Sequence, residues 1–182
     1  MNKFCFLSLL ALLLSCEELP VVNFDNSLDL TTAEELNIEL PAIVFYPDSI
    51  PMEAGSSAQL QVFAMGVTGL SGAHIQINYE QQKLNLKSVT KGEFLNSLTE
   101  PGFYFENDTA EGLLDIYTIS FGVDSLKNVT GTGSLAVVEF EAIAPGKIIL
   151  EYTDKCEFVD EHDNPIEIKS LLYGVLDVAK KS

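Results

Sequence analysis

The stretch Ala73-His74-Ile75-Gln76-Ile77-Asn78-Tyr79 alternates apolar and polar side chains along its whole length. A period of two residues is typical of a β-strand that buries one face and leaves the other outside the core. Gly72 precedes the stretch and favours a turn before it. The sequence therefore predicts a strand over residues 73–79 with His74, Gln76 and Asn78 on its outer face.

Segments of the same kind fill the chain from residue 40 onward. Each is a short apolar or alternating run bounded by turn-forming residues, and only residues 94–98 favour a helical turn. The segment 113–121 is apolar on both faces, so we expect it to be central and covered. A hairpin is expected around residues 160–165. The other predicted strands are 42–46, 59–67, 84–89, 103–106, 134–143, 147–153 and 173–178.

This pattern of strands predicts the fold class. About nine strands with almost no helical periodicity favour an all-β fold, a jelly-roll-type β-sandwich, over any mixed fold. Pro47 and Pro51 are expected to end the first strand, because proline cannot donate a hydrogen bond to a neighbouring strand. We assign residues 40–182 to this one domain.

The N-terminus has the pattern of a bacterial signal peptide. Lys3 gives a positive start, and the largely apolar residues 4–14 are too few to span a bilayer as a helix. The run ends in Leu13-Leu14-Ser15-Cys16, which resembles the lipobox of bacterial lipoproteins. The resemblance implies removal of residues 1–15 and lipid attachment at Cys16, so we expect an exported protein anchored to a bacterial membrane at the cell surface. The alternative is an ordinary signal peptide that happens to contain a cysteine.

Residues 16–39 read as a flexible acidic linker. From residue 17 to residue 39 there are seven acidic side chains and no basic one. Their mutual repulsion favours an extended tether between the anchor and the domain.

Charge and cysteine content limit the function classes. The chain has 27 acidic and 10 basic residues and a net charge of −17, which excludes nucleic acid as a partner because phosphate binding requires clustered positive charge. Cys5 leaves with the signal peptide and Cys16 receives lipid, so the domain retains Cys156 and no disulfide. His74 and His162 are far apart in sequence and suggest no metal site.

Two groups of acidic residues could carry chemistry. Asp108, Glu111 and Asp115 are close enough in sequence to suggest an acid/base pair, but a turn and a strand surface explain them better, so no enzymatic activity is expected. Asp160, Glu161 and Asp163 are three carboxylates in the loop 160–164, which suits either a calcium ion or an ordinary turn, and the turn is favoured because the EF-hand pattern with its glycine is absent. The sequence therefore predicts no metal and no cofactor on this chain.

The order of short motifs resembles that of cohesins, the receptor modules that bind dockerins in cellulosomes. The resemblance spans residues 43–178, and Glu80 stands where cohesins usually carry Asp in a Tyr-Asp-x-x-x-Leu pattern that ends here at Leu84. The motifs are Ala54-Gly55, Gly69-Leu70-Ser71-Gly72-Ala73, Ile77-Asn78-Tyr79-Glu80, Lys91-Gly92-Glu93-Phe94, Gly131-Thr132-Gly133-Ser134-Leu135-Ala136 and Gly174-Val175-Leu176-Asp177-Val178.

The cohesin resemblance implies a non-catalytic, membrane-anchored receptor that binds dockerin-bearing proteins and serves polysaccharide binding or degradation at the cell surface. In cohesins the dockerin helices meet the face made by the third, fifth, sixth and eighth strands, with Ca²⁺ held by the dockerin. The alternation leaves open whether Asp115, Tyr117 and Ile119 on the sixth strand point outward. The partner-binding residues implied on the other three strands are His74, Gln76, Asn78, Tyr104, Glu106, Ile149 and Glu151.

Two other functions remain open. A carbohydrate-binding lipoprotein of related β-sandwich fold would take polysaccharide as its ligand, usually on a row of exposed aromatic rings. The chain has no Trp, and the sequence predicts no linear strip for its tyrosines Tyr46, Tyr104, Tyr117 and Tyr152. A structural or adhesive envelope domain with another protein partner is the third possibility.

Overall fold

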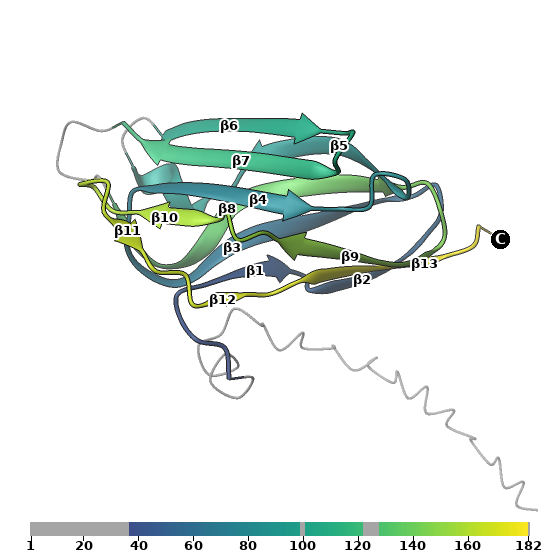
Figure 1. Cartoon of the computed structure of the whole chain (residues 1–182), viewed down its shortest axis with the longest axis horizontal. Coiled ribbons are helices and arrows are strands. Elements are labelled where there is room, and N and C mark those ends of the chain that lie inside the picture. The colour runs from purple at the N-terminus through teal and green to yellow at the C-terminus, as the bar shows by residue number, and fades with distance from the viewer. Residues whose placement is uncertain (1–36, 99–100, 122–127, 182) are drawn as a thin grey trace, which may run out of the picture.

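Two β-sheets lie face to face across a shared apolar core in the computed structural model of the chain (Figure 1). The structure describes residues 37–98, 101–121 and 128–181. The predicted signal peptide, Cys16 and nearly all of the predicted linker lie outside these residues. Within the described ranges, no helix has the length and hydropathy needed to cross a membrane.

The first sheet has five strands. In spatial order they are β12 (Ser170–Leu171), β1 (Ala42–Tyr46), β3 (Ser57–Leu70), β8 (Val129–Ala142) and β5 (Leu84–Lys91). All neighbours are antiparallel except β1 and β12, which run parallel. A short 3-10 helix, η1 (Phe94–Ser97), follows β5, where the sequence predicts a helical turn.

The second sheet carries the strands that matter for function. β7 (Leu113–Ser120) lies between β6 (Pro101–Asp108) and β4 (Gly72–Asn78). The opposite edge of β4 pairs with β10 (Glu157–Val159) along its first half and with β9 (Gly146–Tyr152) at its end. β13 (Gly174–Ala179) follows β9, and β2 (Ser49–Glu53) forms the far edge, while β11 (Pro165–Ile166) pairs with β10.

The core follows the predicted alternation. Leu60, Val62 and Ala64 of β3 face Ile75 and Ile77 of β4, and all five are fully buried in one cluster. Each large aliphatic side chain removed from water in this way contributes about 1.5–3 kcal/mol, before the entropy cost of folding. The all-β sandwich predicted from the sequence is confirmed.

The first strand ends at Tyr46, before Pro47, as predicted, but the sequence missed the strand that follows. Pro51, expected only to help end the first strand, lies inside β2, which pairs in parallel with β13. β2 is the outermost strand of its sheet, so one side of its backbone has no neighbouring strand to receive an N–H group. A proline is tolerated on such an edge because the missing N–H group is not needed there.

A small second apolar cluster lies on the outer side of the first sheet. Ile38 and Leu40 pack there against Ala42, Val44 and Met65. The backbone N–H group of Glu39 donates a hydrogen bond of 3.0 Å to the hydroxyl of Ser170 in β12. Ile38 and Glu39, which the sequence assigns to the linker, therefore contact the domain.

Candidate partner-binding face

The outer face of the second sheet presents the residues implied by the cohesin resemblance. Because Ile75 and Ile77 enter the core, His74, Gln76 and Asn78 lie on the outer side of β4, as predicted. The same alternation places the predicted residues of β6 and β9 outward, and these are exposed: Tyr104, Glu106, Ile149 and Glu151.

The register of the strands brings these side chains into four cross-strand rows. On β6, β7 and β4 every second residue faces outward, so residues paired across the strands share a row. The first row is Gly102, Ile119, Gly72 and Val159; the second is Tyr104, Tyr117, His74 and Glu157; the third is Glu106, Asp115 and Gln76; the fourth is Asp108, Leu113, Asn78 and Glu151.

Three rings stack along the second row. The His74 and Tyr117 rings have centroids 4.4 Å apart and planes 5° from parallel, and Tyr117 and Tyr104 have centroids 6.0 Å apart. The Tyr104 hydroxyl donates a hydrogen bond of 2.7 Å to Glu106, and this bond raises the pKa of Tyr104. Partial burial, followed by the charge of Asp115, raises the pKa of Tyr117. Both phenols are therefore neutral at physiological pH.

Only two of the four tyrosines considered for a sugar-binding strip share this row, because Tyr152 is buried against Phe45 and Tyr46 belongs to the first sheet, so the expectation that the four form no linear strip is confirmed. The geometry of the row also differs from a sugar-binding platform, which offers the flat faces of its rings to solvent. Neighbouring strands lie about 4.8 Å apart, so rings that stack across strands stand upright on the sheet. The faces of Tyr117 and His74 are turned toward each other, and their edges point outward.

A hydrogen-bond network occupies the third row. Asp115 accepts a bond of 2.9 Å from the Gln76 side-chain amide and lies 2.7 Å from Nε2 of His74. The Thr153 hydroxyl donates a bond of 2.8 Å to the amide oxygen of Gln76. The turn from Thr153 to Cys156, which joins β9 to β10, lies against the edge of β4 at this point: the backbone N–H group of Thr153 donates to the carbonyl of Gln76, and the backbone N–H group of Gln76 donates to Sγ of Cys156.

Gln76 is therefore outward-facing but not accessible. Only 5% of its surface is exposed, and both ends of its amide have partners within the chain. The sequence predicted a contact residue here, whereas the structure places a buried residue that bonds to Asp115, the carboxylate that also contacts His74. Alternation along β4 predicted the correct side of the sheet for Gln76, but it could not predict the turn at Thr153 that covers the Gln76 side chain.

Apolar side chains gather around the first two rows, and we call them the apolar end. Their exposed fractions are 56% for Tyr104, 37% for Tyr117, 41% for Ile119 and 63% for Phe121. Gly102 has no side chain, and the ring of Phe121 packs into the space above it, against Ile119. Next to Ile119, over Gly72, the surface has a shallow hollow of about 230 Å³.

The prediction that residues 113–121 are covered on both sides is wrong. Leu114, Ile116 and Thr118 are buried, but Tyr117 and Ile119 point outward and remain exposed. These two residues, together with Asp115 and Phe121, were missing from the predicted site. The signal was present in the sequence, because a strand with two apolar faces needs a cover on each side.

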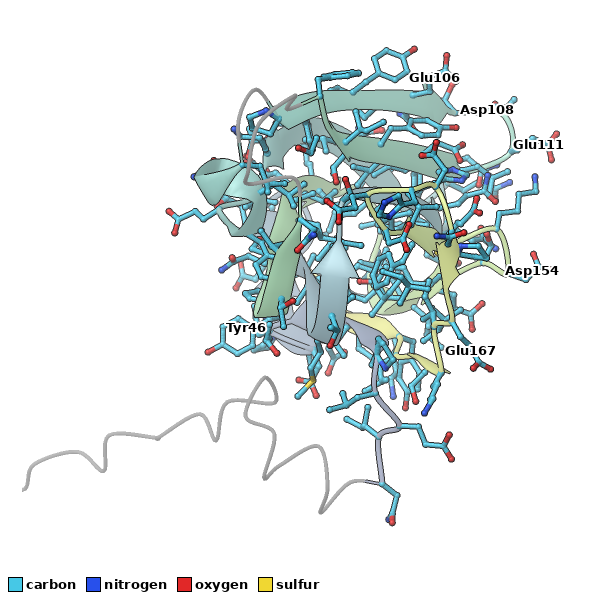
Figure 2. The ribbon with its side chains drawn as sticks, turned by 90° about the vertical axis from the view of Figure 1, so that its left-hand side faces the viewer. Tyr46, Glu106, Asp108, Glu111, Asp154 and Glu167 are labelled. Carbon is cyan, nitrogen blue, oxygen red and sulfur yellow. The ribbon has the colours of Figure 1, made fainter. Side chains whose placement is uncertain are left out.

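Carboxylates gather at the other end of the face, around the third and fourth rows, and we call Glu106, Asp108, Glu111 and Glu151 the acidic end. All four are exposed. Figure 2 shows Glu106, Asp108 and Glu111 together at the upper part of one side of the sandwich, with Tyr46 on the opposite side. The ion pairs of the described residues involve none of these four carboxylates.

β9 extends this end of the face toward β13. Ile149 is 41% exposed, and it lines a hollow of about 360 Å³ together with Asn78, Glu111 and Glu151. Lys147 is the basic residue of this hollow. Six of the seven predicted partner-binding residues are thus accessible on one surface, and Gln76 is the exception.

The acidic groups considered for catalysis occupy structural positions. Asp108 accepts hydrogen bonds from the backbone N–H groups of Ala110 and Glu111 at 2.9 and 3.2 Å, so it stabilises the turn between β6 and β7. Asp115 bonds to Gln76 and His74 on the sheet. This matches the predicted turn and strand roles.

The loop around Asp160 is a turn that its own chain satisfies. The Asp160 carboxylate accepts hydrogen bonds from the backbone N–H groups of His162 and Asn164 at 2.8 and 2.9 Å, and from the Asn164 side chain. These bonds, led by the Asn164 side chain, lower the pKa of Asp160. Over the part of the chain that the structure describes, no three His, Cys, Asp or Glu residues gather to suit a metal ion.

Comparison with known proteins identifies the fold. No protein-family model and no curated sequence matches the chain. A type II cohesin domain from the cellulosome of Acetivibrio cellulolyticus superposes with a TM-score of 0.65 at 17% identity, over 75% of this chain and 93% of that one. The non-cellulosomal cohesin of the archaeon Archaeoglobus fulgidus gives a TM-score of 0.62 at 17% identity, over 76% and 90%.

The domain has the cohesin fold. A cohesin from a type I cohesin–dockerin complex of Clostridium thermocellum also matches, with a TM-score of 0.64 at 12% identity, over 76% of this chain and 98% of that one. The resemblance read from the sequence is thereby confirmed for the fold. On this cohesin-fold domain the four rows form one continuous outer face of the second sheet.

Proposed function

We propose that the chain is a non-catalytic, membrane-anchored receptor that binds the dockerin of another secreted protein on the outer face of its second sheet. One observation supports this most strongly: a cohesin fold whose β7 exposes Tyr117 and Ile119 on that face. Exposed apolar side chains in a contiguous patch are typical of a protein interface.

The position of the chain start favours a tethered receptor. The described chain begins at Asn37, below β1 and β12, whereas β6 and β7 lie on the opposite side of the sandwich in both views (Figures 1 and 2). A linker that enters there leaves the outer face of the second sheet accessible. The proposal therefore includes cleavage after residue 15 and lipid attachment at Cys16.

A protein partner agrees better with the face than a polysaccharide does. Sugar rings stack on flat aromatic faces, whereas the His74 and Tyr117 rings face each other and present their edges. Edges of rings and an aliphatic side chain such as Ile119 suit the ridges of a helix. The link to polysaccharide degradation then lies with the enzymes that carry the dockerin.

A pull-down from the secretome tests the proposal. The full chain, purified in detergent, should capture a dockerin-bearing protein, and a chelator should release it because we expect the dockerin to hold Ca²⁺. Retention on insoluble polysaccharide with no protein partner would support the carbohydrate-binding alternative instead. An organism whose secretome contains no dockerin contradicts the proposal outright.

Lipid attachment needs its own measurement. Mass spectrometry of the mature N-terminus should find Cys16 as the first residue, with acyl chains on it. The Cys16→Ala chain should then appear in the soluble fraction. A mature chain that begins at any other residue contradicts the anchor.

A further inference from the structure

Along β6 and β7 the outer face of the second sheet is divided, with apolar side chains at one end and carboxylates at the other; Glu157 on β10 and Ile149 on β9 are exceptions on the far side of β4. The first two rows carry Ile119, Tyr117 and Tyr104, and the last two carry Glu106 and Glu151. Because the rows cross the strands, the change from apolar to acidic runs along β7 rather than across it.

The length of this division can be worked out from strand geometry. Outward residues of one strand are about 6.7 Å apart, so the first and fourth rows are separated by about 20 Å. A helix laid along β7 rises about 1.5 Å per residue and covers that distance in about 13 residues. The midpoints of the two ends are two rows, or about 13 Å, apart, which corresponds to about nine residues of a helix. Positions i and i+7 or i+8, which share one face of a helix and lie about two turns apart, therefore reach both ends.

Charge adds a requirement at the acidic end. Glu106, Asp108, Glu111 and Glu151 are exposed, outside the ion pairs of the described residues, and part of a chain with a net charge of −17. Lys147 is the basic residue near Glu151. A partner that covers these carboxylates must supply positive charge, because burying unpaired carboxylates is costly.

We propose that this face selects a helix of two-part chemistry: aliphatic residues over the apolar end and, about two turns further along, Lys or Arg over the acidic end. This rests on the proposed function, and it specifies the partner within it. The stacked rings and the Asp115 network hold the apolar end in place before the partner arrives. The helix lies along β7, with its basic half toward the end where Asp108 and Asn78 lie.

Two synthetic helices provide the test. The segregated probe is a lactam-bridged helix of about 18 residues with two Ile at one end of one face and two Arg about two turns away. The mixed probe has the same composition, with each Ile placed beside an Arg. Both are titrated against the full chain in detergent by fluorescence anisotropy, at low and at high salt.

The segregated probe should bind at least about tenfold more tightly than the mixed probe, and salt should reduce that advantage. The double substitution Glu106→Lys and Glu151→Lys should remove about tenfold of the affinity, and Ile119→Ser should remove a similar amount at any salt. Glu167→Lys is the matched control; this exposed residue lies away from the acidic end (Figure 2) and its change should alter affinity less than about twofold.

Equal affinity for the two probes, including no detectable binding of either, overturns this inference. So does a loss of affinity in Glu167→Lys as large as that in the double variant. The proposed function fails separately. A captured dockerin that ignores these substitutions overturns the two-part chemistry and leaves dockerin binding in place. If the secretome contains no dockerin but the segregated probe still binds more tightly, dockerin binding is overturned and the two-part chemistry of the face is retained.

Discussion

Gln76 lies on the outer face, but its buried side chain stabilises the fold and is not accessible to a partner. Its replacement by Met is therefore the most informative single change. Methionine keeps nearly the same volume, so packing under the turn that begins at Thr153 is retained. The change removes the hydrogen bond of 2.9 Å to Asp115 and the bond of 2.8 Å from the Thr153 hydroxyl. The residue is 5% exposed, so water does not replace either bond.

The size of the effect follows from the two bonds. A buried hydrogen bond to a carboxylate contributes about 1.5–3 kcal/mol and a neutral one about 1 kcal/mol. Asp115 keeps His74 as a partner, which offsets part of the loss. We expect Gln76→Met to lower the free energy of unfolding by about 2–3 kcal/mol, and the melting temperature by roughly 5–10 °C for a domain of this size.

Urea unfolding of the full chain in mild detergent, followed by circular dichroism, measures this change. Thr153→Val removes one of the two bonds and should cost about 1 kcal/mol, and the two changes together should cost less than their sum because they share that bond. Asn78→Ala, on the same strand but exposed, is the control and should stay within about 0.5 kcal/mol of the native value. A Gln76→Met chain as stable as Asn78→Ala refutes the assignment of Gln76 to a supporting role.

Three further results are expected. Burial raises the pKa of the Cys156 thiol to about 11, so iodoacetamide at pH 8 should modify it slowly in the folded chain and rapidly in urea. The pKa of Asp160 is lowered in the folded state, so Asp160→Ala should reduce stability at pH 7, and the difference from the native chain should shrink as the pH falls below about 4 in urea titrations. Removal of divalent cations with a chelator should leave the melting temperature of the isolated chain unchanged, since Asp160 is already satisfied by His162 and Asn164.

Local periodicity was enough to predict the sandwich. The alternation of residues 73–79 placed Ile75 and Ile77 in the core, and the same reasoning placed Ile149 and Glu151 outside it. These predictions depend only on the pleat of a strand, because successive side chains along it point to opposite faces of the sheet. They need no knowledge of distant parts of the chain.

Burial by distant segments was not predictable in this way. Gln76 is covered by a turn that begins at Thr153, 77 residues further along the sequence. The strand that contains Pro51 depends on its place at the edge of the sheet, which is set by pairing with β13 near the other end of the domain. Alternation tells which side of a sheet a residue faces, and tertiary pairing decides what covers it.

β7 is the case in which the failed prediction is itself informative. Its two apolar faces led to the expectation of a strand covered on both sides, and Leu114 and Ile116 do enter the core. Tyr117 and Ile119 have no such cover among the described residues, and they stay 37% and 41% exposed. A sequence pattern cannot distinguish a cover supplied by the same chain from one supplied by another, because both bury the same apolar surface. Residues 37–98, 101–121 and 128–181 supply no cover for it, and the apolar outer face of β7 is for that reason the strongest argument that a partner binds there.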